Sequence, residues 1–129
     1  MMLADPADLP RRFAALWGAH DARGIAALFA PDGEFLSLTG GAAQNPKEIA
    51  ELLAGEFAGA FQRARLVTGR TRLRPMGDSA AVVWQRFVLS GLVDAQGAEA
   101  GRIGAAFCAT LERVGAGWQI VSAQFVVEG

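Results

Sequence analysis

The second half of the chain, from Leu66 to Val127, contains four long segments with strand character that are joined by short turns. Links this short connect antiparallel neighbours, because a parallel pair needs a long crossover connection. One large antiparallel sheet is therefore predicted, and within 129 residues such a sheet dominates the fold. The expected strands span residues 65–74, 80–90, 102–113 and 118–127.

Three amphipathic helices are predicted before this sheet. Asp5 can cap the first, which has a proline at its first position and ends near Gly18. Asp21 is the expected cap of a short second helix. Asn45 begins the third helix, and Glu48 stands where it can bond back to the cap residue. A short strand over residues 34–39 lies between the second and third helices.

The two faces of the predicted sheet are both rich in apolar residues. On the strand from Ala80, Val82 and Trp84 share one face, whereas Val83 and Phe87 share the other. A sheet that is apolar on both sides is covered on both sides. The helices can cover one face, and a second copy of the chain is the simplest cover for the other, which predicts a homodimer.

Composition is that of a globular chain, and we expect a single domain over residues 1–129. The net charge of −1 argues against a nucleic-acid partner. The lone cysteine, Cys108, cannot form an internal disulfide, and residues 1–10 lack a basic start and an apolar core. No apolar run approaches the roughly 18 residues of a spanning helix. These features predict a cytoplasmic protein without membrane contact.

The order of elements resembles the nuclear transport factor 2-like superfamily, and more closely its SnoaL-like branch of small bacterial proteins, including the SgcJ/EcaC-type group. The resemblance rests on Leu16–Asp21, Leu28–Phe35, Pro46–Ile49 after Gly40, and Trp118–Val121 with Gln124. It implies a cone-shaped α+β cystatin-like roll, in which three N-terminal helices pack on a strongly curved, mostly antiparallel sheet. A pocket between helices and sheet, and frequent dimers, are also implied.

The resemblance leaves two classes of function open, because the superfamily includes isomerases, cyclases, dehydratases and proteins with no chemistry. The first is a pocket for a small apolar, cyclic or polyketide-like molecule, with cofactor-free proton transfer if the protein is an enzyme. The second is a non-catalytic ligand-binding or dimeric accessory protein. The chain has no tyrosine and one histidine, so a tyrosine oxyanion donor and a two-histidine arrangement are excluded.

Asp32 and His20 are the candidate catalytic residues. A carboxyl group in an apolar cleft can act as a general acid or base, and Asp32 follows the end of the second helix. The alternative is an ordinary turn aspartate in Pro-Asp-Gly. His20 would orient a substrate oxygen. Its alternative is a surface position at a helix break, next to the cap Asp21.

The candidate ligand-binding residues are aromatic and amide side chains: Trp17, Phe35, Phe57, Gln85, Phe107 and Gln124. Each ring has the alternative of simply filling the core. A buried amide such as Gln85 needs hydrogen-bond partners, which a ligand can supply. We find no metal-ligand spacing and no glycine-rich phosphate loop, so neither a metal nor a cofactor is expected.

Five arginines lie close together in the sequence without an intervening acid: Arg63, Arg65, Arg70, Arg72 and Arg74. The last three share one face of the first long strand. They can bind an acidic partner, or they can protect an edge strand from unwanted pairing.

Overall fold

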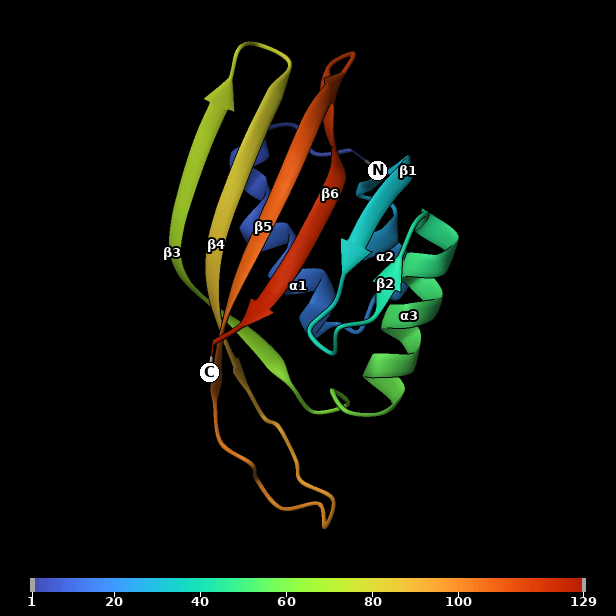
Figure 1. The fold of residues 1–129 in the computed structure, drawn as a ribbon, viewed down its shortest axis with the longest axis vertical. Coiled ribbons are helices and arrows are strands. Elements are labelled where there is room, and N and C mark those ends of the chain that lie inside the picture. Colours follow the sequence, from blue (N-terminus) through green and yellow to red (C-terminus); the bar gives the residue numbers. More distant parts are fainter. Residues whose placement is uncertain (1, 129) are drawn as a thin grey trace.

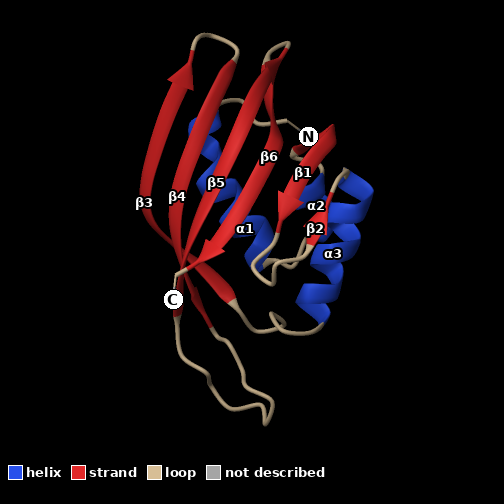
Figure 2. Ribbon diagram, in the orientation of Figure 1, coloured by secondary structure: helices blue, strands red, loops and turns tan. Residues whose placement is uncertain are grey.

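The four long strands predicted for the second half are present, with bounds close to those expected. They are β3 (Arg65–Met76), β4 (Ala80–Ser90), β5 (Ile103–Val114) and β6 (Gly117–Val127). Consecutive strands pair antiparallel, as predicted. The computed structural model describes residues 2–128, and Figures 1 and 2 show these four strands as one broad layer.

The predicted helices begin at the predicted caps. They are the 3-10 turn η1 (Pro6–Asp8) running into α1 (Leu9–Gly18), then α2 (Ala22–Ala26) and α3 (Pro46–Ala58). The side chains of Asp5, Asp21 and Asn45 each accept a hydrogen bond from an N–H of the first turn. The Glu48 side chain was expected to bond to the cap residue Asn45. Its Oε1 instead accepts a hydrogen bond from the N–H of Gln44, the residue before the cap, at 3.0 Å.

Two short strands complete the sheet, whose order is β2-β1-β6-β5-β4-β3. They are β1 (Phe29–Leu36) and β2 (Ala42–Ala43). β1 runs parallel to β6, so the sheet is mixed but mostly antiparallel. The turn predicted at residues 31–33 is an irregularity inside β1, where pairing passes from Phe29 with Ile120 to Glu34 with Ser122. The segment 30–33 is thus looped out of the ladder.

The helices cover one face of the sheet, with α1 lying behind the long strands in Figure 1. Phe13 of α1 enters a cluster of rings from the sheet, and its ring centroid is 4.6 Å from that of Phe107. Phe87 and Phe125 complete the cluster. The predicted α+β roll is therefore confirmed, with its core between the helices and this inner face.

The link between β4 and β5, residues 91–102, projects beyond the end of the sheet (Figure 1). Val93 and Glu99 form an isolated bridge within it. Its tip is closed by Asp94, whose side chain accepts hydrogen bonds from the N–H groups of Gln96 and Ala98, both at 2.9 Å.

Candidate functional site

The predicted pocket between helices and sheet is filled by side chains. Phe107 is fully buried and Trp17 is 1% exposed, so neither lines a space that water can enter. Trp17 meets Phe57 edge-on, with ring centroids 5.3 Å apart. Phe35 is also buried and packs edge-on against Phe125. The expectation that these rings surround an open apolar cavity is therefore corrected, because the rings themselves occupy that volume.

Gln85, the buried amide predicted to meet a ligand, is fully occupied by the protein. Its Nε2 donates to the carbonyl oxygens of Gly69 at 3.2 Å and Arg86 at 2.8 Å, and its Oε1 accepts from the Thr71 hydroxyl. The pairing of β3 with β4 is irregular between Thr68 and Thr71. The amide thus satisfies backbone groups that this bulge leaves unpaired. The hydrogen-bond partners of Gln85 are thus supplied by the protein itself, and a ligand contact of Gln85 remains a prediction.

Phe35 and Gln124 are brought together at the edge of the sheet. Both line a hollow of about 210 Å³ between β1, β2 and the end of β6, together with Glu34 and Leu36. The Gln124 amide donates to the hydroxyl of Ser122. Small-molecule pockets span about 300–1,000 Å³, so this hollow suits only a small fragment.

The two candidate catalytic residues belong to different parts of the fold. Asp32 is exposed in the looped-out segment of β1, so its predicted position in an apolar cleft is wrong. His20 joins α1 to α2 with a φ of 56°. Its ring stacks on Phe57 of α3, with centroids 4.8 Å apart. No contact joins the two side chains, and their catalytic roles remain predictions.

A buried carboxylate, Glu56 of α3, was not anticipated from the sequence. Its Oε2 accepts hydrogen bonds from the hydroxyls of Ser37 at 2.6 Å and Thr39 at 2.7 Å. Ser37 is buried as well, and its Oγ accepts from Gly41 N–H at 3.2 Å. The cluster fastens the end of α3 to the loop between β1 and β2. Ser37 and Thr39 are two residues apart in an extended segment, and this spacing was the feature of the sequence that could have indicated that both side chains point to one side.

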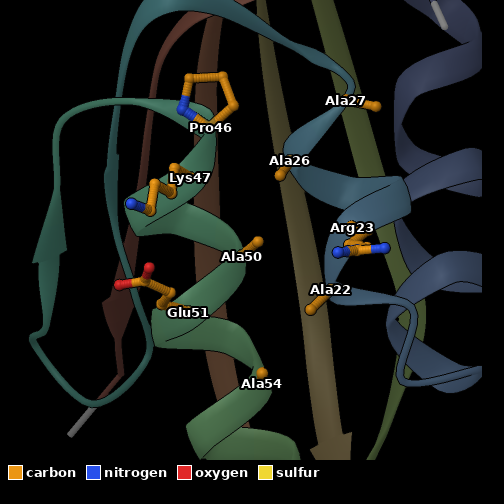
Figure 3. Close-up of a pocket in the computed structure, with 9 residues that line it drawn as sticks. All are labelled: Ala22, Arg23, Ala26, Ala27, Pro46, Lys47, Ala50, Glu51 and Ala54. Carbon is orange, nitrogen blue, oxygen red and sulfur yellow. The ribbon is translucent and has the colours of Figure 1, made fainter.

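A hollow of about 640 Å³ lies between α2 and α3. Ala22 and Ala26 point across it toward Ala50 and Ala54, and Lys47 and Glu51 point away from α2 (Figure 3). Alanines leave this trough open because their side chains are short. Its lining is mostly alanine, with Arg23, Lys47 and Glu51 as the charged members.

The face of the sheet turned away from the helices is called the outer face here. It consists of the even-numbered residues of β4 from Ala80 to Ser90 and their partners on neighbouring strands, and it is half-buried at its centre. Trp84 lies between Val82 and Arg86, and pairs with Cys108 of β5. The guanidinium of Arg72 lies 4.7 Å from the centroid of the Trp84 ring, a cation–π contact.

An ion pair crosses this outer face. Arg86 donates from Nε and Nη2 to the two carboxylate oxygens of Glu128, at 2.8 and 2.9 Å. These hydrogen bonds are the main reason why the pKa of Arg86 is raised and the pKa of Glu128 is lowered. The pair lies over Gly104, where a Cβ atom would come within 2.8 Å of Arg86 Nη2. Glycine at this position therefore lets the pair lie flat on the sheet.

Within residues 2–128 there is no group of three or more His, Cys, Asp or Glu side chains that could hold a metal ion. The helices described in that range are all too short or too polar to cross a membrane.

The family model described as a SnoaL-like domain matches residues 7–124. The chain therefore belongs to the SnoaL-like domain family, within the nuclear transport factor 2-like superfamily that the sequence resembles. No curated protein sequence matches the chain.

Solved structures share this fold at low sequence identity. An uncharacterized cystatin-like protein from Caulobacter vibrioides has a TM-score of 0.84 and 13% identity, over 95% of this chain and 87% of that one. A putative calcium/calmodulin dependent protein kinase II association domain from Xanthomonas campestris has a TM-score of 0.76 and 20% identity, over 97% and 90%. An NTF2-like protein from Novosphingobium aromaticivorans has 0.76 and 22%, over 92% and 76%.

Proposed function

We propose that this protein is a non-catalytic SnoaL-like domain that pairs with a second copy of itself through the outer face of its sheet. The observation that carries the proposal is the position of Trp84, which lies half-buried at the middle of a sheet face that none of the helices within residues 2–128 covers. Val82 and Val88 flank it on the same strand face. An apolar sheet face without cover favours association.

The inner side of the sheet supports the same proposal by offering no room for a substrate. Phe107 and Phe87 are fully buried in the ring cluster, and Asp32 is exposed away from it. A general acid or base has to reach the reacting group within hydrogen-bond distance. Among residues 2–128, the rings of the inner face leave Asp32 no buried position from which to make that approach.

The size of the outer face is sufficient for a stable pair. Five strands at about 4.8 Å spacing and about nine residues at 3.3 Å each give a plane of roughly 700 Å². Specific interfaces bury about 800 Å² of accessible surface on each partner, which is comparable. The Xanthomonas campestris neighbour, whose description calls it an association domain, has the same fold.

A cytoplasmic setting is part of the proposal, since one cysteine and no disulfide suit a reducing compartment.

Sedimentation equilibrium at micromolar concentration tests self-association. We expect a dimer for the wild type and a monomer for Trp84→Glu, which places a charge at the centre of the interface. Leu73→Glu is the matched control, because Leu73 is 41% exposed and pairs with Val83, on the inner side of the same sheet. A short bis-maleimide should also join two Cys108 thiols, since β5 is the central strand of the outer face. A wild type that sediments as a monomer would refute the proposal.

The hollow lined by Phe35 and Gln124 favours a second candidate, binding of a small apolar molecule at the sheet edge. Neither Asp32 nor His20 lines this hollow, so the candidate is binding without proton transfer. A fragment screen followed by NMR shift mapping tests it. The candidate requires shifts confined to Phe35, Gln124 and their neighbours, and shifts spread over the surface would eliminate it.

A further inference from the structure

We infer that the twofold axis of the pair runs parallel to the strands along β5, so that the arginines on β3 of one copy meet Glu34 on β1 of the other. This inference rests on the proposed self-association and adds its geometry. In a face-to-face pair of identical sheets the axis lies in the plane between them. Its two limiting directions run along the strands and across them, and the charges on the outer face distinguish these two.

The pairing registers define rows of residues that cross the outer face from β3 to β1. One row contains Arg74, Val82, Thr110, Ser122 and Glu34, each paired with the next. The row beside it contains Arg72, Trp84, Cys108, Gln124 and Leu36. β5 stands at the middle of both rows, with two strands on either side.

The two ends of these rows carry opposite charge. Arg70, Arg72 and Arg74 line the β3 edge and are exposed, and no acid of the described residues forms an ion pair with them. Glu34 is exposed at the β1 end. The charge of Arg86, nearer the centre, is already matched by Glu128. The outer face therefore has a basic β3 edge and one acid, Glu34, at its β1 end, and Glu112 is exposed near one end of β5 between them.

A twofold axis along β5 places the β3 side of one sheet against the β1 side of the other. Each residue keeps its position along the strand direction. β3 of one copy then faces β1 of the other, and Arg74 faces Glu34 of the second copy twice in each pair. Sheets lie about 10 Å apart, and their relative twist of about 30° moves opposing edges by about 5 Å. An arginine and a glutamate side chain together span that separation.

An axis across the strands gives the opposite electrostatic result. β3 then faces β3, and the arginine edge of one copy lies against the same edge of the other with no acid between them. Like charges placed against each other oppose association. Cys108 lies near the centre in both arrangements, so its cross-linking reports the pair but not the direction of the axis.

Charge exchange between Arg74 and Glu34 distinguishes the two axes. With the axis along β5, Arg74→Glu and Glu34→Arg each place like charges together twice, and each should raise the dimer dissociation constant by about tenfold at low salt. The double variant Arg74→Glu/Glu34→Arg restores both contacts, so its dissociation constant should return to within about threefold of wild type. Arg11→Glu and Glu51→Arg are matched reversals on helices, on the other side of the sheet, and should change nothing.

An axis across the strands reverses these results, because Arg74→Glu would then tighten the pair and Glu34→Arg would leave it unchanged. That pattern overturns the inferred axis while the proposed dimer stands. The neutral variants Arg74→Gln and Glu34→Gln keep the test valid if a reversal disturbs folding, since each should weaken the pair to a smaller extent. A monomeric wild type without Cys108 cross-linking would instead refute self-association itself.

Discussion

The two faces of β4 differ in what completes their burial. On the inner face, Val83, Gln85 and Phe87 are fully buried by helices and neighbouring strands of the same chain. On the outer face, Val82 and Trp84 alternate with them and stay half-buried. A side chain on the inner face thus has its complete set of contacts within one chain, whereas its neighbour on the outer face does not. Alternate residues of one strand can therefore serve folding and association separately.

Truncation of an aromatic ring on the inner face should cause the largest loss of stability. Phe107→Ala removes a fully buried ring that lies 4.6 Å from Phe13 and 4.8 Å from Phe125 between centroids. We expect the free energy of unfolding to fall by about 3–5 kcal/mol, measured by urea denaturation at fixed protein concentration. Phe107→Leu refills part of the space and should cost less. A loss below about 1 kcal/mol for the alanine variant would mean that the cluster is not closely packed.

Removal of the buried Glu56 carboxylate should cause the second largest loss of stability. Glu56→Ala removes the acceptor that the Ser37 and Thr39 hydroxyls share. The two hydroxyls lie 3.0 Å apart and only one can donate to the other, so the buried Ser37 hydroxyl is the one at risk of losing its acceptor. Burying unpaired donors costs about 1–3 kcal/mol, which thermal or urea unfolding would detect. Glu56→Gln keeps an acceptor oxygen and should lose less than the alanine variant. Equal losses for both variants would contradict a role for hydrogen bonding.

The cation–π contact on the outer face should contribute less than either inner feature. Arg72→Met keeps the apolar stem but removes the charge over Trp84. We expect a loss of about 0.5–1 kcal/mol in the free energy of unfolding, together with a change in tryptophan fluorescence. Arg70→Met is the control, because Arg70 lies in the same hollow without that ring contact. An equal response of both variants would argue against the contact.

The exposed ion pair should have the smallest effect, visible only as a pH dependence. The pKa of Glu128 is lowered in the folded state, so the contribution of the pair is present above the ordinary glutamate value of 4.5. It is lost as the pH falls through the lowered value. NMR titration of the Glu128 carboxyl should give a midpoint that rises in Arg86→Gln. An unchanged midpoint would show that the hydrogen bonds do not form in solution.

The fold was predictable because local signals and periodicity agree along the chain. Asp5, Asp21 and Asn45 act as caps where the sequence predicted them. The long strands have strand-type composition, and glycines mark the turns between them, although only β4 alternates in burial along its whole length. Each of these signals acts over a few residues, so it can be read without knowing the packing.

The site was much less predictable because it depends on volumes contributed by distant elements. Phe13, Phe87, Phe107 and Phe125 come from four elements, and only their packing shows that the central space is filled. The tripeptide Pro-Asp-Gly around Asp32 is compatible both with the mouth of a pocket and with an exposed bulge, so the sequence alone does not distinguish the two positions. Gln85 was read correctly as an amide that needs partners, but the partners come from a bulge that no sequence signal marks.

The filled centre has a consequence for how such a domain can change. The space between the helices and the sheet is filled by phenylalanine rings. Each ring occupies volume that a cavity would need. Shortening one or two phenylalanines would open a dry chamber of the kind that takes up benzene-sized molecules. A change of one or two side chains could therefore convert this filled core into a binding cavity, provided that the remaining packing keeps the fold stable.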